Sequence, residues 1–235
     1  MYLILMAAGG AAYYAVLQRP PADRQAASGE AKAEASNAAQ QEAEGKMAAG
    51  KKTAEEEAKK RLEAAEQRAK QREELIAGMQ VITRGGVTYY TYHHDEHPMS
   101  GVYLRPFIAE RDGDCVLKND VYYYSSLEDE NYGWLHADHL DVNADGYTVT
   151  LAFDSGKRRD KLGKGAESVT ENYVVNADPA TIQMLKAVGN ASHVTLHFYQ
   201  AGSPGTVSDL GRADIRRVRD MVTLYELFQA EKQGN

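Results

Sequence analysis

Cysteine is nearly absent from this sequence, because Cys115 is the only one in 235 residues. The chain therefore cannot close an internal disulfide bond, and it cannot bind zinc through paired cysteines. Cys115 lies in "DCVLKNDVYYY", whose alternation is typical of a strand, so we expect a quiet buried thiol rather than a nucleophile. The sequence also lacks a glycine-rich phosphate loop and a serine in a nucleophile-elbow pattern. These absences leave the sequence-based case for catalysis weak.

Aromatic residues are missing from a long segment. Between Arg19 and Gln80 the chain has no Tyr, Phe or Trp, but it has 17 alanines, 12 Lys or Arg and 12 Asp or Glu. From Val81 onward it has 12 of the 15 tyrosines, all four Phe and the single Trp. About 155 residues of this kind are enough to bury a core. We therefore expect one globular domain over residues 81–231.

An excess of positive charge is missing as well. The formal net charge is −7, and all of it comes from the C-terminal part, with 15 Lys or Arg against 22 Asp or Glu. Nucleic-acid binders need cations that displace the counterions of phosphates, so we expect no nucleic-acid partner. The basic run "GKRRDKLGKG" (156–165) is bounded by glycines, which predicts a hairpin or loop rather than a phosphate site.

The first 18 residues carry no charge and are just long enough to cross a bilayer as a helix. No basic residue precedes this run and "YYAVLQRPP" is a poor cleavage site, so we favour an uncleaved transmembrane anchor over a cleaved signal or a buried helix. Arg19 and Arg24 weakly favour a cytoplasmic body, but large domains translocate largely regardless of charge. We expect a single-pass protein of the cell membrane with its C-terminal domain outside the cytoplasm.

Residues 19–52 are rich in Ala, Glu and Gln without apolar periodicity, which predicts a disordered linker. Residues 53–79 predict a charged helix, with a capping box at Thr53 and Glu56 and a stop at Gly78. Its apolar stripe is thin, so a solvated rigid spacer is favoured over a coiled coil. The order of anchor, Ala/Glu/Lys helix and compact domain resembles TolA-like envelope proteins. That resemblance is compositional, covers the first third of the chain and implies no activity.

Short alternating runs such as "GVTYYTY", "GVYLRPFIA", "YTVTLAF" and "SHVTLHFYQ" dominate residues 81–231 and favour strands. "NADG" (143–146) predicts a hairpin turn between two of them. "DPATIQMLKAVGN" predicts a helix that begins after Asp178 and stops at Gly189. In "ADIRRVRDMVTLYELFQAEKQ", helical spacing predicts a buried apolar stripe that includes Ile215, Val218, Val222 and Leu224. Together these runs predict an α+β fold with a mostly antiparallel sheet of about six strands and two helices.

Two stretches have the residue types of a metal site. "TYHHDEHPM" (91–99) would place His93 and His97 on one side of a strand, but a zinc site needs three or four ligands and Pro98 follows, so a polar loop is favoured. "DVNADG" (141–146) places Asp141, Asn143 and Asp145 like the first half of a calcium loop. Its twelfth position is Ala152 instead of Glu, so a hairpin turn is favoured there too. No cofactor is expected.

The tyrosines are the best functional lead. "TYYTY" and "VYYYSS" place Tyr on both faces of their strands, and an exposed Tyr beside Trp suits a peptide or glycan. The expected binding residues are Tyr90, Tyr92, Tyr122, Tyr124 and Trp134. The first alternative is an envelope hydrolase that uses His and Asp residues of "WLHADHLD" (134–141), and the second is a structural envelope component. We favour a membrane-anchored binding module over an enzyme.

Overall fold

The computed structural model describes residues 55–95, 98–130 and 132–234, and the expected anchor (1–18) and linker (19–52) lie outside them. Residues 55–77 form a helix that ends just before Gly78, as the sequence predicts. None of the helices among the described residues is long and apolar enough to cross a membrane. The chain divides into two compact units, Met1–Glu66 and Gln67–Asn235, and the second contains both sheets and the two later helices.

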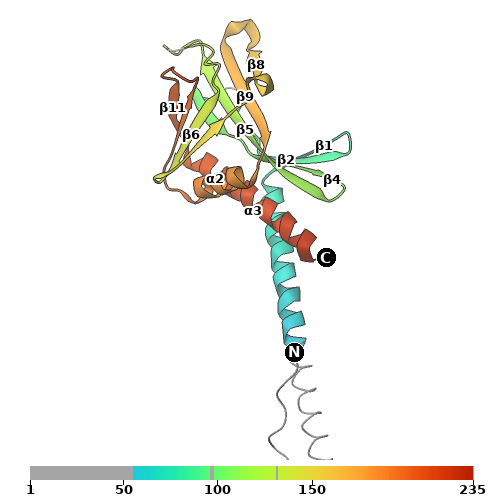
Figure 1. The fold of residues 1–235 in the computed structure, drawn as a ribbon. Helices are drawn as coiled ribbons and strands as arrows, with labels where there is room; N and C mark the ends of the chain where they lie inside the picture. The colour runs from blue at the N-terminus through green and yellow to red at the C-terminus, as the bar shows by residue number, and fades with distance from the viewer. Residues whose placement is uncertain (1–54, 96–97, 131, 235) are drawn as a thin grey trace, which may run out of the picture. The chain divides into compact units, whose positions relative to one another are not determined.

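The α+β class and the antiparallel pairing are confirmed, but the expectation of one sheet of about six strands is wrong. The described residues form a seven-stranded sheet, ordered β1-β2-β4-β5-β9-β8 with β3 also paired to β5, and a four-stranded sheet, ordered β11-β10-β6-β7 (Figure 1). The strands of the larger sheet are β1 (Gln80–Arg84), β2 (Val87–Thr91), β3 (Gly101–Leu104), β4 (Phe107–Arg111), β5 (Asp114–Ser126), β8 (Arg159–Leu162) and β9 (Ser168–Asn176). Those of the smaller sheet are β6 (His139–Ala144), β7 (Tyr147–Ala152), β10 (Val194–Tyr199) and β11 (Thr206–Asp209).

Three hairpins share one kind of two-residue turn. Gly85–Gly86 joins β1 to β2, Asp112–Gly113 joins β4 to β5, and Asp145–Gly146 joins β6 to β7. All six turn residues have positive φ, which is the type I′ geometry that matches the twist of the flanking strands. The hairpin turn predicted from "NADG" therefore forms.

β3 and β4 act as one long strand against β5. Leu104 pairs with Val121 and Phe107 pairs with Lys118, so the register continues unchanged across the two residues between them. Pro106 has no N–H to donate and interrupts the ladder there. The backbone N–H of Arg105 still donates to the carbonyl of Asp120 at 2.8 Å. The continuous register fixes which side chains of this hairpin share a face.

The core lies between the two sheets and is closed by α2 (Pro179–Asn190) and α3 (Arg212–Gly234), which lie together at one end of them (Figure 1). The predicted stripe of α3 is buried, since Ile215, Val218, Val222 and Leu224 are at most 4% exposed. α2 begins after Asp178 as predicted, and the Asp178 carboxylate accepts the Thr181 N–H at 2.7 Å.

The expected stop of α2 at Gly189 is wrong, because the helix continues to Asn190. A Cβ at Gly189 would lie 2.9 Å from the Cα of Arg219, and the Arg219 Nε donates to the Gly189 carbonyl at 2.6 Å. This glycine therefore serves the close approach of α2 and α3 rather than helix termination.

The last turns of the helix expected as a spacer pack on the folded unit. Leu75, Ile76 and Met79 are half-buried against the core, and Arg72 forms an ion pair with Glu231 of α3 at 2.6 Å. The second compact unit, Gln67–Asn235, therefore includes the end of this helix and begins fourteen residues before residue 81, the start expected from the aromatic content.

Candidate functional site

The larger sheet has one face turned away from the core, which we call the outer face. Alternation along the hairpin of β3, β4 and β5 puts Val102, Leu104, Ile108, Leu117 and Val121 inside, each at most 2% exposed. The intervening residues lie on the outer face: Tyr103, Arg105, Phe107 and Ala109 on one strand, and Val116, Lys118, Asp120, Tyr122 and Tyr124 on β5. The register then places Asn172 of β9 beside Tyr122 and Arg159 of β8 beside Asn172.

A groove of about 930 Å³ lies on this outer face over β5, β9 and β8. It is lined by His94, Asp95, Arg105, Asp120, Tyr122, Tyr124, Arg159, Lys161, Leu162, Gly163, Lys164, Ser168, Thr170 and Asn172. This is the size range of sites for small ligands or for a few units of a polymer. Leu162 is the single aliphatic side chain in the lining, so the groove is chiefly polar and aromatic.

Arg105 and Tyr122 form one wall of the groove. The guanidinium carbon of Arg105 lies 3.6 Å from the centre of the Tyr122 ring and 5.4 Å from that of Tyr103. Such stacking over a ring is favourable because the ring face is electronegative. The buried Nε of Arg105 has no hydrogen-bond partner among the described residues. The buried Nε2 of His94 has none there either. Both groups line the groove and keep hydrogen-bonding capacity to offer.

Two ionisable groups of the groove are shifted in opposite senses. Burial raises the pKa of Asp120 to about 6, against the opposing effects of its hydrogen bond from Asn172 and of the positive Arg105 and Arg159. Burial also lowers the pKa of His94 to about 4, and the nearby Arg105 contributes in the same direction. At neutral pH His94 is therefore uncharged, while Asp120 is ionised and becomes protonated on mild acidification.

The opposite wall carries three cations. Arg159 and Lys161 alternate on β8, Lys164 follows in the turn after it, and all three are exposed. None of them forms a salt bridge with the described residues, whereas Arg158 just before them pairs with Asp160. Together with Arg105 they give the groove four cations against Asp95 and Asp120. This is a local excess of positive charge on a chain of net charge −7.

The five residues expected to form a binding face do not gather. Tyr122 and Tyr124 line the groove, although Tyr124 is only 6% exposed. Tyr90 and Tyr92 contact α3 instead: the Tyr90 ring lies 5.2 Å from that of Phe228, and the Tyr92 hydroxyl donates to Asp220 at 3.0 Å. Trp134 is half-buried against the core in the loop before β6. The reason is that side chains alternate along a strand. Tyr89 of β2 lies on the outer face, so Tyr90 and Tyr92 lie on the opposite side.

The side chains expected as metal ligands take part in other contacts. His93 is exposed and its Nδ1 lies 3.0 Å from the Gln80 Nε2, while His97 lies outside the described residues. The Asn143 side chain accepts the Gly146 N–H within the hairpin turn, and the Asp145 carboxylate accepts the backbone N–H groups of Ser192 and His193. Over the described ranges, no group of three or more His, Cys, Asp or Glu side chains is arranged to hold a metal.

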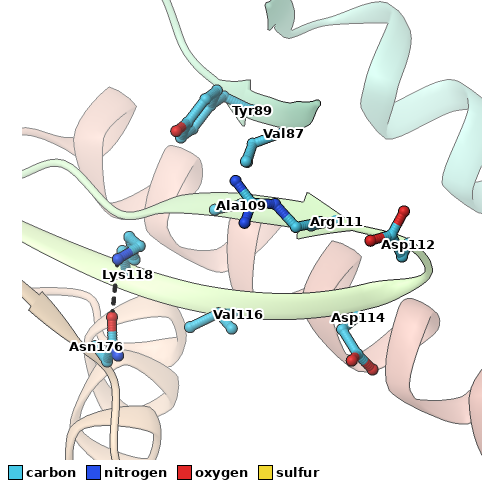
Figure 2. A pocket seen from close by; sticks show the side chains of 9 residues that line it. All are labelled: Val87, Tyr89, Ala109, Arg111, Asp112, Asp114, Val116, Lys118 and Asn176. Atoms are coloured by element: carbon cyan, nitrogen blue, oxygen red, sulfur yellow. Dashed lines mark hydrogen bonds between the residues drawn. The ribbon is translucent and has the colours of Figure 1, made fainter. Parts of the chain in front are cut away.

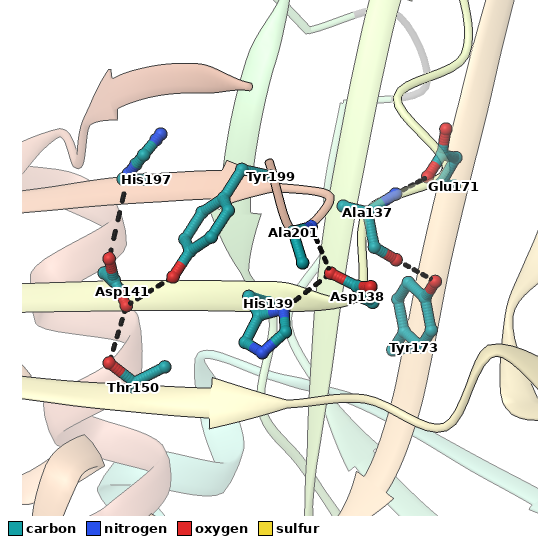
Figure 3. Close-up of polar contacts among 10 residues, drawn as sticks. All are labelled: Ala137, Asp138, His139, Asp141, Thr150, Glu171, Tyr173, His197, Tyr199 and Ala201. Carbon is teal, nitrogen blue, oxygen red and sulfur yellow. Dashed lines mark hydrogen bonds and ion pairs between the residues drawn. The ribbon is translucent and has the colours of Figure 1, made fainter. Parts of the chain in front are cut away.

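Of the residues expected in a hydrolase, Asp138, His139 and Asp141 come together with His197 on the outer side of the smaller sheet (Figure 3). His136 lies apart from them, with its ring stacked on that of Trp134 at a centroid distance of 6.2 Å. The rings of His197, Tyr199 and His139 stack in a row, with centroids 4.5 Å and 5.3 Å apart. Asp138 lies 2.5 Å from the His139 Nδ1, and Asp141 accepts hydrogen bonds from Thr150 at 2.6 Å and Tyr199 at 3.4 Å. The row offers a His–Asp dyad.

A nucleophile for such a dyad is not in position among these residues. Thr195 Oγ1 lies 3.2 Å from the Nε2 of His193, but the Asp209 carboxylate lies 3.6 Å from that same nitrogen. A hydrolytic relay needs the carboxylate on one ring nitrogen and the nucleophile on the other. Cys115 offers no replacement, because burial raises the pKa of its thiol to about 11.

The outer face continues beyond the groove along β5. There a shallow pocket of about 460 Å³ lies among Val87, Tyr89, Ala109 and Val116, with charged residues at its edge (Figure 2). Lys118 donates to Asn176 at 2.9 Å and separates this apolar part from the groove. β5 therefore contributes residues to both sites: Val116 and Lys118 to the pocket, and Asp120, Tyr122 and Tyr124 to the groove.

Sequence reasoning missed Tyr103, Arg105, Arg159, Lys161 and Lys164. A signal for the last three was present in "GKRRDKLGKG", which we expected to be a hairpin or loop. The expected hairpin forms: β8 is its first arm, a short 3-10 turn follows, and β9 is its second arm. Alternation along β8 places Arg159 and Lys161 on the outer face.

Comparisons with known proteins give little more. No known protein family matches the chain, and neither does any curated protein. Among solved structures, the crystal structure of invasion associated protein B from Bartonella henselae is similar with a TM-score of 0.33 and 9% sequence identity. The match covers 66% of this chain and 94% of that one.

Proposed function

We propose that the folded unit is a binding module that holds a peptide or glycan ligand in the groove over β5, β9 and β8. The observation that carries this proposal is the groove itself, where Tyr122, four cations and hydrogen-bonding groups converge on a space of about 930 Å³. Ligand sites usually combine an aromatic ring with a small number of polar groups placed around it.

Binding accounts for this site better than catalysis does. Arg105 and Tyr122 support each other by stacking, and Asn172 holds Asp120, so the lining is preorganised. The hydrolase alternative rests on the Asp138–His139 dyad, which lies on the smaller sheet beside the stacked ring of Tyr199. That dyad has no aligned hydroxyl or thiol among its described partners, so the enzyme is the weaker candidate.

In this proposal the N-terminal part of the chain serves presentation. An uncharged run over residues 1–18 anchors the protein in the cell membrane, and the charged segment that follows extends the module on the extracytoplasmic side. The support is the sequence alone, namely the absence of charge in the run and the helix-forming composition after it. Recovery of the full-length chain in a soluble fraction at full mass would contradict the anchor.

The test of the proposed function is a binding screen with the full chain in detergent against arrays of oligosaccharides and peptides. We expect a ligand whose binding weakens in Tyr122→Leu and is unchanged in Tyr147→Leu, a tyrosine that is 45% exposed on β7 of the other sheet. Ligands that bind both variants as well as the parent chain would place the function elsewhere on the molecule. Melting curves of both variants report whether Tyr122→Leu remains folded.

A further inference from the structure

We infer that the ligand of the groove is an oligosaccharide that carries carboxylate or sulfate groups. This inference rests on the proposed function and assigns its ligand class. It is drawn from three cations that form no salt bridge with the described residues, from the chemistry of the lining, and from the paired strands β5 and β9 at the floor of the groove.

The cations are free to bind anions. Arg159, Lys161 and Lys164 form no salt bridge with the described residues, although the chain has more acids than bases. Unpaired cations in a groove raise the local concentration of anions, and an arginine can hold a carboxylate or sulfate through two parallel hydrogen bonds. Arg159 and Lys161 are two residues apart on β8, so their side chains leave the strand about 7 Å apart on one side. That spacing suits successive charges on a polymer.

The lining favours a sugar over a peptide. Tyr122, Ser168, Thr170 and Asn172 supply hydroxyl and amide groups, and the lining holds a single aliphatic side chain. A peptide ligand needs apolar pockets for its anchoring side chains, or a free strand edge to which it can add. The floor of the groove is made by β5 and β9, whose backbone groups are paired on both sides along this stretch. The floor therefore offers side-chain contacts and no free backbone, and the free edge of the sheet lies on β8, at the side of the groove.

The two acids of the groove set its selectivity. Asp120 is hydrogen-bonded by Asn172, which leaves it at the base of the groove between Arg105 and Arg159. Asp95 lies on the loop side, close to His94. The cations of β8 and of the turn after it are the outermost charges, and they meet an approaching anion first. A ligand with anions along one side and hydroxyls along the other fits this arrangement.

The experiment is calorimetric titration of the full chain with four probes, each a tetramer. They are tetragalacturonic acid, its uncharged methyl ester, a sulfated tetramer of a neutral sugar, and a tetraglutamate peptide. We expect the galacturonate or the sulfated tetramer to bind at least tenfold more tightly than the methyl ester. That binding should weaken as salt rises from about 50 to 500 mM, because exposed charges are screened. The two anionic sugars distinguish carboxylate from sulfate recognition.

The variant Arg159→Ala/Lys161→Ala should lose at least tenfold in affinity for the anionic sugar. The matched control is Lys59→Ala/Lys60→Ala, which removes the same charge from an exposed part of the helix at residues 55–77. Lys164→Ala, a single change in the turn, should lose severalfold and guards against misfolding of the double variant.

The outcomes separate the inference from the proposed function. Equal affinity for the acid and its methyl ester, or binding of the glutamate peptide alone, would overturn the anionic sugar while leaving a binding module. Equal losses in the β8 variant and the control would place the binding outside the groove and overturn both. Failure of all four probes at millimolar concentration would also overturn the inference, and the array screen would then decide the proposed function.

Discussion

The guanidinium carbon of Arg105 lies 3.6 Å from the centre of the Tyr122 ring, and this stack joins two neighbouring strands of the groove. Arg105 lies at the interruption between β3 and β4, where Pro106 cannot donate to the ladder. The stack therefore adds a side-chain contact at the point where backbone pairing is weakest. It also orients the Tyr122 ring toward the groove.

Arg105→Lys should lower the free energy of unfolding by about 1 kcal/mol, because an ammonium cannot stack flat on the ring as a guanidinium does. The positive charge remains, so loss of charge cannot explain the change. Urea unfolding measures it. Arg84→Lys is the control, since Arg84 is exposed in β1 and its side chain has no hydrogen-bond or ion-pair partner among the described residues. Equal stability of the Arg105 and Arg84 variants would show that the stack contributes nothing.

Glu171→Gln should destabilise the protein by about 2–4 kcal/mol. The Glu171 carboxylate is fully buried and accepts three backbone N–H groups: those of Leu135 at 2.6 Å, His136 at 2.7 Å and Ala137 at 3.2 Å. A glutamine would turn its own N–H₂ toward one of these donors, which would leave a buried donor unsatisfied. Denaturant unfolding of the full chain measures the loss.

Glu167→Gln is the matched control for Glu171, because Glu167 is exposed in the turn just before the same strand. Its unfolding curve should coincide with that of the parent chain. A Glu171→Gln protein as stable as this control would show that the loop over residues 132–138 is held by other contacts. These include the hydrogen bond from the Tyr173 hydroxyl to the Ala137 carbonyl (Figure 3).

Local rules of sequence reading account for much of the fold and little of the groove. The turn at Asp145–Gly146, the cap at Asp178 and the buried stripe of α3 follow from neighbouring residues, so the sequence alone predicts them. The division into two sheets depends on which strands pair across long separations, as β5 does with β9. The groove combines residues of β5, β8 and β9 with Arg105 from between β3 and β4, and no spacing in the sequence brings Arg105 near Arg159. The sequence predicts Tyr90 rather than Tyr89 on a binding face, and this is wrong because alternation shows two faces of a strand without telling which one meets the core.

The start of the folded unit can be located by truncation. A chain of residues 67–235 should melt cooperatively, because it keeps Leu75, Ile76 and Met79 against the core and the Arg72–Glu231 ion pair. A chain of residues 80–235 loses these contacts, and it should melt at least 5 °C lower, since a loss of 1 kcal/mol lowers the melting temperature by about 2–4 °C for domains of this size. Calorimetry of the two chains decides. Equal melting temperatures would show that residues 67–79 do not stabilise the folded unit and that the whole helix is a solvated spacer.

The opposite pKa shifts of Asp120 and His94 lead to a final prediction of how the stability of the protein changes with pH. Burial raises the pKa of Asp120 to about 6, whereas in the unfolded chain it lies near 3.9. Between about pH 4 and 6 the folded protein keeps a proton that the unfolded chain has released, so the contribution of Asp120 to stability falls as the pH rises through this window. Burial lowers the pKa of His94 to about 4, against about 6.5 when unfolded. Its contribution is fully present above pH 6.5 and is lost as the pH falls toward 4.

The two contributions therefore oppose each other in the parent chain, and each variant should expose the other group. Asp120→Asn keeps the oxygen that accepts from Asn172, and its melting temperature should fall more steeply than that of the parent between pH 6.5 and 4.5. His94→Gln removes the histidine, and its melting temperature should rise relative to the parent over the same acidification. The differences from the parent at each pH cancel the titration of every other group. Parallel curves for all three proteins would show that neither side chain is buried enough to change its proton affinity on folding.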